Sequence, residues 1–404
     1  MIISFILLIA YCKLFIGCSS INRKTLSLVS IFIYCIYSTS DYIWLVDNLR
    51  WPFHPSDPSA YYTEIYGKSF SQILHIESSN TFYYIINWLT NKFWENPFFC
   101  SLVLRLDNIL TYSVAYLLVS NKCKNIGIID LVLLFNPYVL VTIARNVRDC
   151  YIILFVVIIL SALNILSNIK LNKVWLIIGC LLLYITRPIL FIPVLLVIFI
   201  KKKQFLSKRI RYTIYTILIV CLIAFSHEII IKISSQMVSA INYIGEDIEM
   251  YVPLLSGQIS LPIIFSLIKR LSIGLISMMF TPHPVNFLTY WLNANEINGV
   301  IDIYTRLDNA MIFWGGVFNY VFVIPIISNA LRKSIFNRYI MIFAMGFIIL
   351  YVVAYIGVVD IRNRNTAIFF VMLSLLYTQQ KIRLSLNDFF ISGCFFIGIS
   401  LISH

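Results

Sequence analysis

The sequence predicts an all-α, polytopic integral membrane protein with about 12 transmembrane helices. Of its 404 residues, 60% are apolar and only 12% are charged, and the mean hydropathy is +0.87. A soluble domain with this balance would have an apolar surface, so composition excludes that class. No polar stretch is long enough for a separate soluble domain, and we therefore expect residues 1–404 to form one integral-membrane domain.

The charge distribution predicts how the chain is threaded. Six short hydrophilic stretches contain basic residues and no acidic ones: 23–24, 122–124, 170–173, 201–211, 332–338 and 381–383. By the positive-inside rule these stretches are cytoplasmic. The net charge of +13 is therefore explained by membrane topology. It gives no support for binding nucleic acid, which needs a basic face on a soluble domain.

Apolar segments alternate with those basic stretches. We expect crossings near 1–17, 26–46, 98–120, 126–143, 149–168, 174–187, 188–200, 212–232, 309–330, 339–359, 365–379 and 386–403. The first segment is interpreted as a retained helix, because it lacks the basic start and the cleavage site of a signal peptide. The run 174–200 contains "YITRPILFIP", which is compatible with one kinked helix or two short ones.

Two stretches remain after the crossings are assigned, 47–97 and 233–308, and we expect both to be large extracytoplasmic loops. Each mixes aromatic residues, proline, asparagine and serine with isolated apolar runs. Helices that lie on or dip into the outer membrane face would produce this pattern.

Charged residues gather at the expected outer ends of three helix junctions. They are Arg145, Arg148 and Asp149, then Arg187, and then Asp360, Arg362 and Arg364. An arginine near hydrocarbon is costly unless an anion offsets its charge, and its planar guanidinium suits phosphate. We predict that the five arginines bind a lipid-linked phosphate or diphosphate. The alternative is that they reach to lipid headgroups or pair with the two aspartates.

The first outer loop contains "RWPFHPSDPSAYYTEIYGKSF", in which two prolines flank Asp57. A carboxylate held this way is a candidate general base toward a sugar hydroxyl, and Tyr61 and Tyr62 are candidate sugar-binding residues. The alternative is a proline–aspartate turn within an interfacial aromatic belt. In the second loop, His283 of "TPHPV" is a candidate sugar contact or proton acceptor, or else a turn residue.

The order of these motifs resembles the C-type integral-membrane glycosyltransferases and, more closely, bacterial O-antigen and exopolysaccharide repeat-unit polymerases. The resemblance rests on Asp-x-x-x-Tyr in the first outer loop, followed by "FYYIINWL", "RLDNILTYSVAYLL" and "NPYVLVTIARNVRD". It covers roughly 40–200, with a weaker match at "DIRNRN", and 233–308 holds no recognisable family motif. It implies that Asp57 is the acidic residue of the first loop. It further implies that Arg145, Arg148 and Arg187 hold a polyprenyl diphosphate.

The resemblance leads to an expected function: polymerisation of oligosaccharide repeats on undecaprenyl diphosphate, at the periplasmic face of a bacterial inner (cytoplasmic) membrane. Arginines would stabilise the departing diphosphate, and Asp57 or Asp149 would act on the acceptor hydroxyl. No cofactor or metal is expected, since no P-loop, GxGxxG or HExxH motif is present. The expected partners are the lipid-linked oligosaccharide and membrane lipid, with a chain-length regulator protein as a further candidate.

Two alternatives stay open. A C-type glycosyltransferase would use a polyprenyl-monophosphate sugar as donor. The sequence does not distinguish a donor with one phosphate from a donor with two. A flippase for the same lipid-linked sugar should have two related halves and charged residues buried in mid-helix. No internal repeat is visible, and we expect the mid-helix segments to be free of charge.

Overall fold

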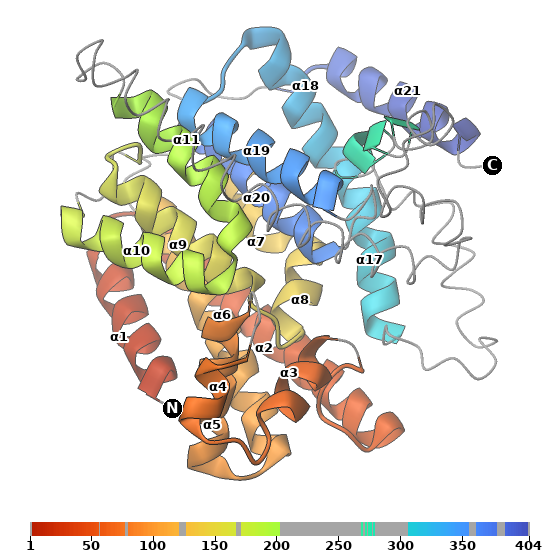
Figure 1. The fold of residues 1–404 in the computed structure, drawn as a ribbon. Coiled ribbons are helices and arrows are strands. Elements are labelled where there is room, and N and C mark those ends of the chain that lie inside the picture. Colours follow the sequence, from red (N-terminus) through yellow and green to blue (C-terminus); the bar gives the residue numbers. More distant parts are fainter. Residues whose placement is uncertain are drawn as a thin grey trace, which may run out of the picture.

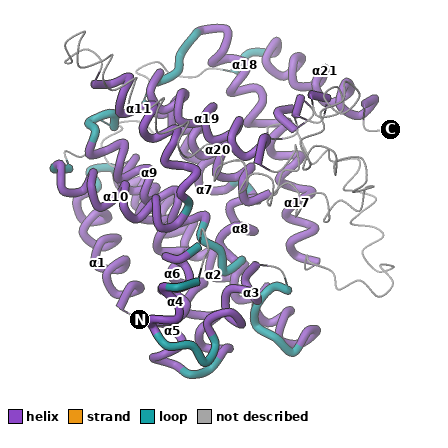
Figure 2. The backbone as a smooth tube through the Cα atoms, viewed as in Figure 1, coloured by secondary structure: helices purple, strands orange, loops and turns teal. Residues whose placement is uncertain are grey.

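The computed structural model is helical throughout the residues that it describes, and Figure 2 shows no strand in that part. These residues are 2–55, 57–76, 80–120, 127–166, 171–202, most of 268–278, 306–354, 361–377 and 384–402. The predicted all-α class is confirmed for them. The predicted helix 212–232 and nearly all of the predicted loop 233–308 lie outside the described residues.

The helices follow the predicted apolar segments closely (Figure 1). In chain order they are α1 (Ile2–Gly17), α2 (Ile21–Leu49), α3 (Asp57–Ile65), α4 (Phe70–Leu74), α5 (Thr81–Trp94), α6 (Pro97–Ser120), α7 (Ile128–Phe135), α8 (Pro137–Ala144), α9 (Asp149–Ala162), α10 (Lys173–Thr186), η1 (Pro188–Leu190), α11 (Phe191–Lys202), α17 (Arg306–Phe318), η4 (Asn319–Val323), α18 (Ile324–Lys333), α19 (Arg338–Ala354), α20 (Ile361–Leu376) and α21 (Leu386–Ile402). The predicted loop 47–97 contains α3, α4 and α5, so the helices expected there are present.

Prolines and caps divide the predicted crossing 126–143 and separate 174–187 from 188–200. Asn136 accepts a hydrogen bond from the Tyr138 amide, and Pro137 occupies the first turn of α8, which separates α7 from α8. Pro188 follows Arg187, where the backbone leaves the helical region, and begins the short η1. The run 174–200 is therefore two helices, α10 and α11, joined by a single 3₁₀ turn.

Three described helical stretches are long and apolar enough to cross a membrane: α2, α6 and Leu307–Lys333, which joins α17, η4 and α18. Shorter apolar helices, each between 10 and 17 residues, include α1, α9, α10, α19 and α21. Long apolar helices of this kind are typical of membrane proteins.

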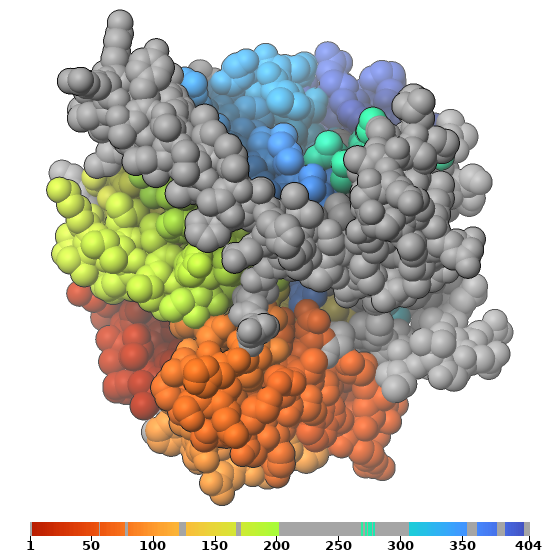
Figure 3. Space-filling view, viewed as in Figure 1, coloured from red at the N-terminus to blue at the C-terminus, as the bar shows by residue number. Residues whose placement is uncertain are grey.

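Helix α6 lies at the centre of the N-terminal half, where it packs against α1, α2, α5 and α9. Helix α8 connects this half to the C-terminal half through α2, α17 and α20. A Cβ on Gly315 would lie 2.2 Å from the Tyr138 ring, so glycine is required where α17 meets α8. The segment 47–97, orange in Figure 3, covers one end of the molecule.

The first basic stretch contains a buried arginine. Arg23 is fully buried, and its Nη2 lies 3.4 Å from Asp130 Oδ2. Asp130 also accepts hydrogen bonds from the Tyr116 hydroxyl and from the Gly127 amide, both at 3.0 Å. Arg23 is therefore neutralised inside the fold by a carboxylate that is distant in the sequence, and the cytoplasmic position of this stretch stays a prediction.

Candidate functional site

The largest group of buried charges centres on Asp41, in the C-terminal half of α2. Its Oδ2 accepts hydrogen bonds from Arg105 Nη1 of α6 at 2.8 Å and from His54 Nε2 at 3.0 Å. Arg105 Nη1 also donates to the Ser38 carbonyl at 3.1 Å. His54 belongs to the segment between α2 and α3. Because a carboxylate only accepts, the His54 proton in this contact is on Nε2.

Asp308, in the first turn of α17, extends this group. Arg145, at the junction of α8 and α9, donates to Asp308 Oδ2 through Nε at 3.3 Å and through Nη2 at 3.1 Å. The Tyr37 hydroxyl donates to Asp308 Oδ1 at 2.5 Å. His54 Nε2 lies 3.9 Å from Asp308 Oδ2 and links the two halves. We call Asp41, His54, Arg105, Arg145 and Asp308 the buried charge network.

The buried charge network has balanced charge, with two carboxylates facing two guanidinium groups. The donor atoms of Asp41, His54 and Asp308 lie within 4.8 Å of one another, a spacing that a metal ion can bridge. Arg105 and Arg145 already neutralise both carboxylates, so a divalent ion would leave a surplus of buried positive charge. The geometry therefore fits proton handling better than metal binding.

His54 contributes the one imidazole ring of this network. Its Nδ1 is buried and has no hydrogen-bond partner among the described residues. Because Nε2 is directed at Asp41, Nδ1 is the ring nitrogen that remains to act on another group. Asp41 holds the ring in this orientation, which is the arrangement that positions a histidine as a base.

A second group surrounds Asp57, the first residue of α3. Arg362, in the first turn of α20, donates to Asp57 Oδ2 through Nη1 and Nη2, both at 3.1 Å. The pair is partly solvated, with the carboxylate side chain 47% and the arginine side chain 18% exposed. The Tyr61 hydroxyl lies 3.5 Å from the same oxygen. Asp57 is thus part of an ion pair at the surface.

Arg148 completes the Asp57 cluster, which we define as Asp57, Tyr61, Arg148 and Arg362. Burial raises the pKa of Tyr61, and the neighbouring charges of Arg148 and Arg362 oppose that rise. Arg148 is buried, and its Nη1 has no hydrogen-bond partner in the described part of the chain. Arg148 is one of the predicted phosphate ligands, and this N–H is available to an anion.

The other predicted ligands lie in separate environments. The Arg187 guanidinium stands 5.5 Å from the centre of the Tyr351 ring, and Arg364 lies next to Tyr138. Asp149 begins α9 and is buried, and it forms no ion pair with any described residue. The alternative in which Arg145 pairs with Asp149 is not observed, since Arg145 is bound to Asp308.

The predicted sugar contacts have different positions. The Tyr62 ring stacks on Phe53 with centroids 4.8 Å apart, and its hydroxyl donates to Asn91 Oδ1 at 3.0 Å. Burial raises the pKa of Tyr62 to about 12. Tyr62 therefore packs α3 against the protein, whereas Tyr61 faces the charged groups. His283 lies outside the described residues, and the sugar-binding roles stay predictions.

Four residues of the buried charge network were not predicted from the sequence: Asp41, His54, Arg105 and Asp308. The expectation that mid-helix segments are free of charge is wrong, because Asp41 lies inside α2 and Arg105 inside α6. The available signal was a charged residue within an apolar segment long enough to cross a membrane. The sequence marked His54 only by its position three residues before Asp57.

The candidate site therefore consists of two groups, the buried charge network and the Asp57 cluster. Arg145 and Arg148 connect them, since both lie at the junction of α8 and α9. No family model matches the sequence, and no curated protein or solved structure is significantly similar to it. The site rests on the geometry of this chain alone.

Proposed function

We propose that the chain is a multi-pass protein of a bacterial inner membrane, with about 12 crossings. The positions of its apolar helices support this proposal. The basic C-terminal end of α11 and the basic turn between α18 and α19 lie at the opposite end of the molecule from α3, α4 and α5 (Figure 1). By the positive-inside rule, the end with α3 to α5 would be extracytoplasmic.

At that extracytoplasmic end, the proposed activity is polymerisation of oligosaccharide repeats carried on undecaprenyl diphosphate. One observation carries it: the buried Arg148, with an available N–H, lies beside Tyr61 and the Asp57–Arg362 pair. A guanidinium with a free donor in a partly solvated, charged cluster suits a phosphate group. Arg362 would contribute a second positive charge toward a departing diphosphate.

The reaction would proceed by attack of an acceptor hydroxyl on the anomeric carbon of the donor sugar. The bond between that carbon and the phosphate oxygen breaks, and the diphosphate leaves with the electron pair. The hydroxyl proton needs an acceptor, for which the chain offers the Asp57 carboxylate and His54 Nδ1. Asp149 stays a third candidate, held at the N-terminus of α9.

A flippase for the same lipid-linked sugar is the second candidate, and the buried charges favour it. Asp41 and Arg105 form an ion pair inside two candidate membrane-spanning helices, as expected for a translocation path. The polymerase remains our main proposal, because Asp41 and Arg105 are bound to each other, whereas Arg148 lies in the partly solvated Asp57 cluster with an N–H available to an anion.

Deletion of the gene, followed by gel analysis of the surface polysaccharide, distinguishes the two. A polymerase deletion should leave single repeats attached to their lipid and abolish the ladder of longer chains. Loss of every repeat, including the single one, would instead support the flippase. An unchanged ladder would refute both. Complementation with an Arg148→Met variant should fail to restore the ladder if Arg148 holds the phosphate.

A further inference from the structure

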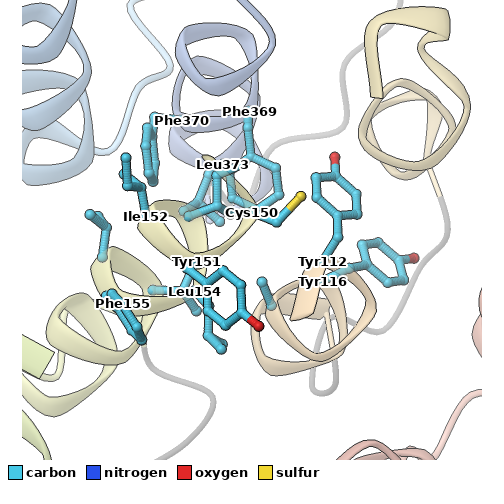
Figure 4. Packing of buried hydrophobic residues seen from close by; sticks show 14 of the residues in the cluster. Tyr112, Tyr116, Cys150, Tyr151, Ile152, Leu154, Phe155, Phe369, Phe370 and Leu373 are labelled. Carbon is cyan, nitrogen blue, oxygen red and sulfur yellow. The ribbon is translucent and has the colours of Figure 1, made fainter. Parts of the chain in front are cut away.

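A third polar group lies deep between α1, α5, α6 and α9, away from the two groups described above. Asp107 and Thr111 are four residues apart on α6, so their side chains share one helix face. Tyr83 of α5 and Tyr151 of α9 approach that face, with ring centroids 6.2 Å apart. Figure 4 shows the Tyr151 hydroxyl directed toward α6. Ser4 of α1 lies next to Asp107.

These side chains have buried oxygen atoms that are not hydrogen-bonded. No oxygen of Asp107 and no hydroxyl oxygen of Ser4, Tyr83, Thr111 or Tyr151 forms a hydrogen bond of normal geometry with a described residue, although Ser4 interacts with Asp107 and Thr111 with Tyr151. Asp107, Thr111, Tyr83 and Tyr151 are each at least 98% buried. A buried carboxylate without a partner is costly, and so is each orphaned hydroxyl. This cluster of buried oxygen atoms therefore indicates a bound species that interacts with several of them at once.

We propose that Asp107, Thr111, Tyr83, Tyr151 and Ser4 form a binding site for a small monovalent cation, Na⁺. All the available ligand atoms are oxygens, which hard cations prefer. The single carboxylate supplies one negative charge, so a monovalent ion leaves the site neutral. A divalent ion would leave an uncompensated positive charge in a buried position.

A bound Na⁺ would join four helices that otherwise meet through apolar contacts. It would also reach the Asp57 cluster, because the Tyr83 ring packs on the Tyr61 ring with centroids 5.3 Å apart. The cation site would exist whichever reaction the protein catalyses. A competing source of positive charge is the N-terminal amino group, because α1 packs against α6, which carries Asp107.

The test is thermal unfolding of the full-length protein in detergent, with NaCl exchanged for choline chloride at constant ionic strength. The apparent Tm of the wild type should rise by roughly 2 °C for each tenfold increase in Na⁺ above half-saturation. Asp107→Asn should abolish this response, and Thr111→Val should shift it to higher Na⁺. Asp47→Asn removes an exposed carboxylate of α2 and should keep the full response.

Binding of radioactive ²²Na⁺ to the same preparations gives a direct readout. One site per chain is expected in the wild type and in a version whose N-terminal extension moves the amino group away. No saturable binding in either preparation would overturn the proposal. Full binding by Asp107→Asn would also overturn it. If Asp107→Asn does not fold, Thr111→Val and Tyr151→Phe must weaken binding for the proposal to stand.

Discussion

Arg145 and Arg148 are three residues apart, but their environments predict different phenotypes for the same substitution. Arg145→Met removes the guanidinium that donates twice to Asp308, a carboxylate with no exposed surface. A buried charge that loses its ion-pair partner costs about 3–5 kcal/mol. Total unfolding free energies are about 5–15 kcal/mol, so this loss should be easy to measure.

Arg148→Met should behave in the opposite way. Arg148 forms no ion pair with a described residue, and its Nη1 is already unsatisfied. Removing it should change the unfolding free energy by about 1 kcal/mol or less. Polysaccharide synthesis should nevertheless fail, because the proposed phosphate ligand is gone. Arg148→Lys should be nearly as inactive, since lysine keeps the charge but lacks the planar pair of donors.

Unfolding of the purified variants in detergent, by heat and by denaturant, measures the first effect. The polysaccharide ladder of complemented deletion strains measures the second. The double variant Arg145→Met/Asp308→Asn is the matched control, because it also removes the stranded carboxylate charge and should recover part of the lost stability. Wild-type stability of Arg145→Met would refute the assigned ion pair. An active Arg148→Met at normal expression would refute the phosphate role.

Three further predictions use the same preparations. His54→Gln keeps a hydrogen-bond donor toward Asp41 but removes the Nδ1 base. Activity should therefore fall by roughly 10²-fold or more, with little change in Tm. An active variant would exclude His54 as the base. Asp57→Asn and Arg362→Ala break a partly solvated pair and should cost about 1 kcal/mol or less, and both should reduce activity if the pair acts as a unit. In a version of the protein without native cysteines, a cysteine introduced at Ser71 should react with a membrane-impermeant reagent in intact spheroplasts. A cysteine introduced at Ser334 should react only after permeabilisation. The reverse pattern would invert the proposed topology.

The positions of the helices followed from the sequence because they depend on local properties. Apolar runs near the length of a bilayer crossing mark α2 and α6, and proline begins α6 and α8 and follows the end of α10. The break at Pro137 was not predicted, although Asn136 and Pro137 together form a recognisable helix start. The two possibilities left open around Pro188 were resolved by the backbone at Arg187.

The charged partners were decided by the tertiary structure alone. Asp57 and Arg362 are 305 positions apart in the sequence, and Arg145 and Asp308 are 163 apart. Both arginines were expected to share one anion site, yet each is bound to a carboxylate from a different helix. Which charges meet depends on which helices become neighbours and how each is rotated about its axis. Periodicity and composition specify neither, because packing across the whole bundle sets both.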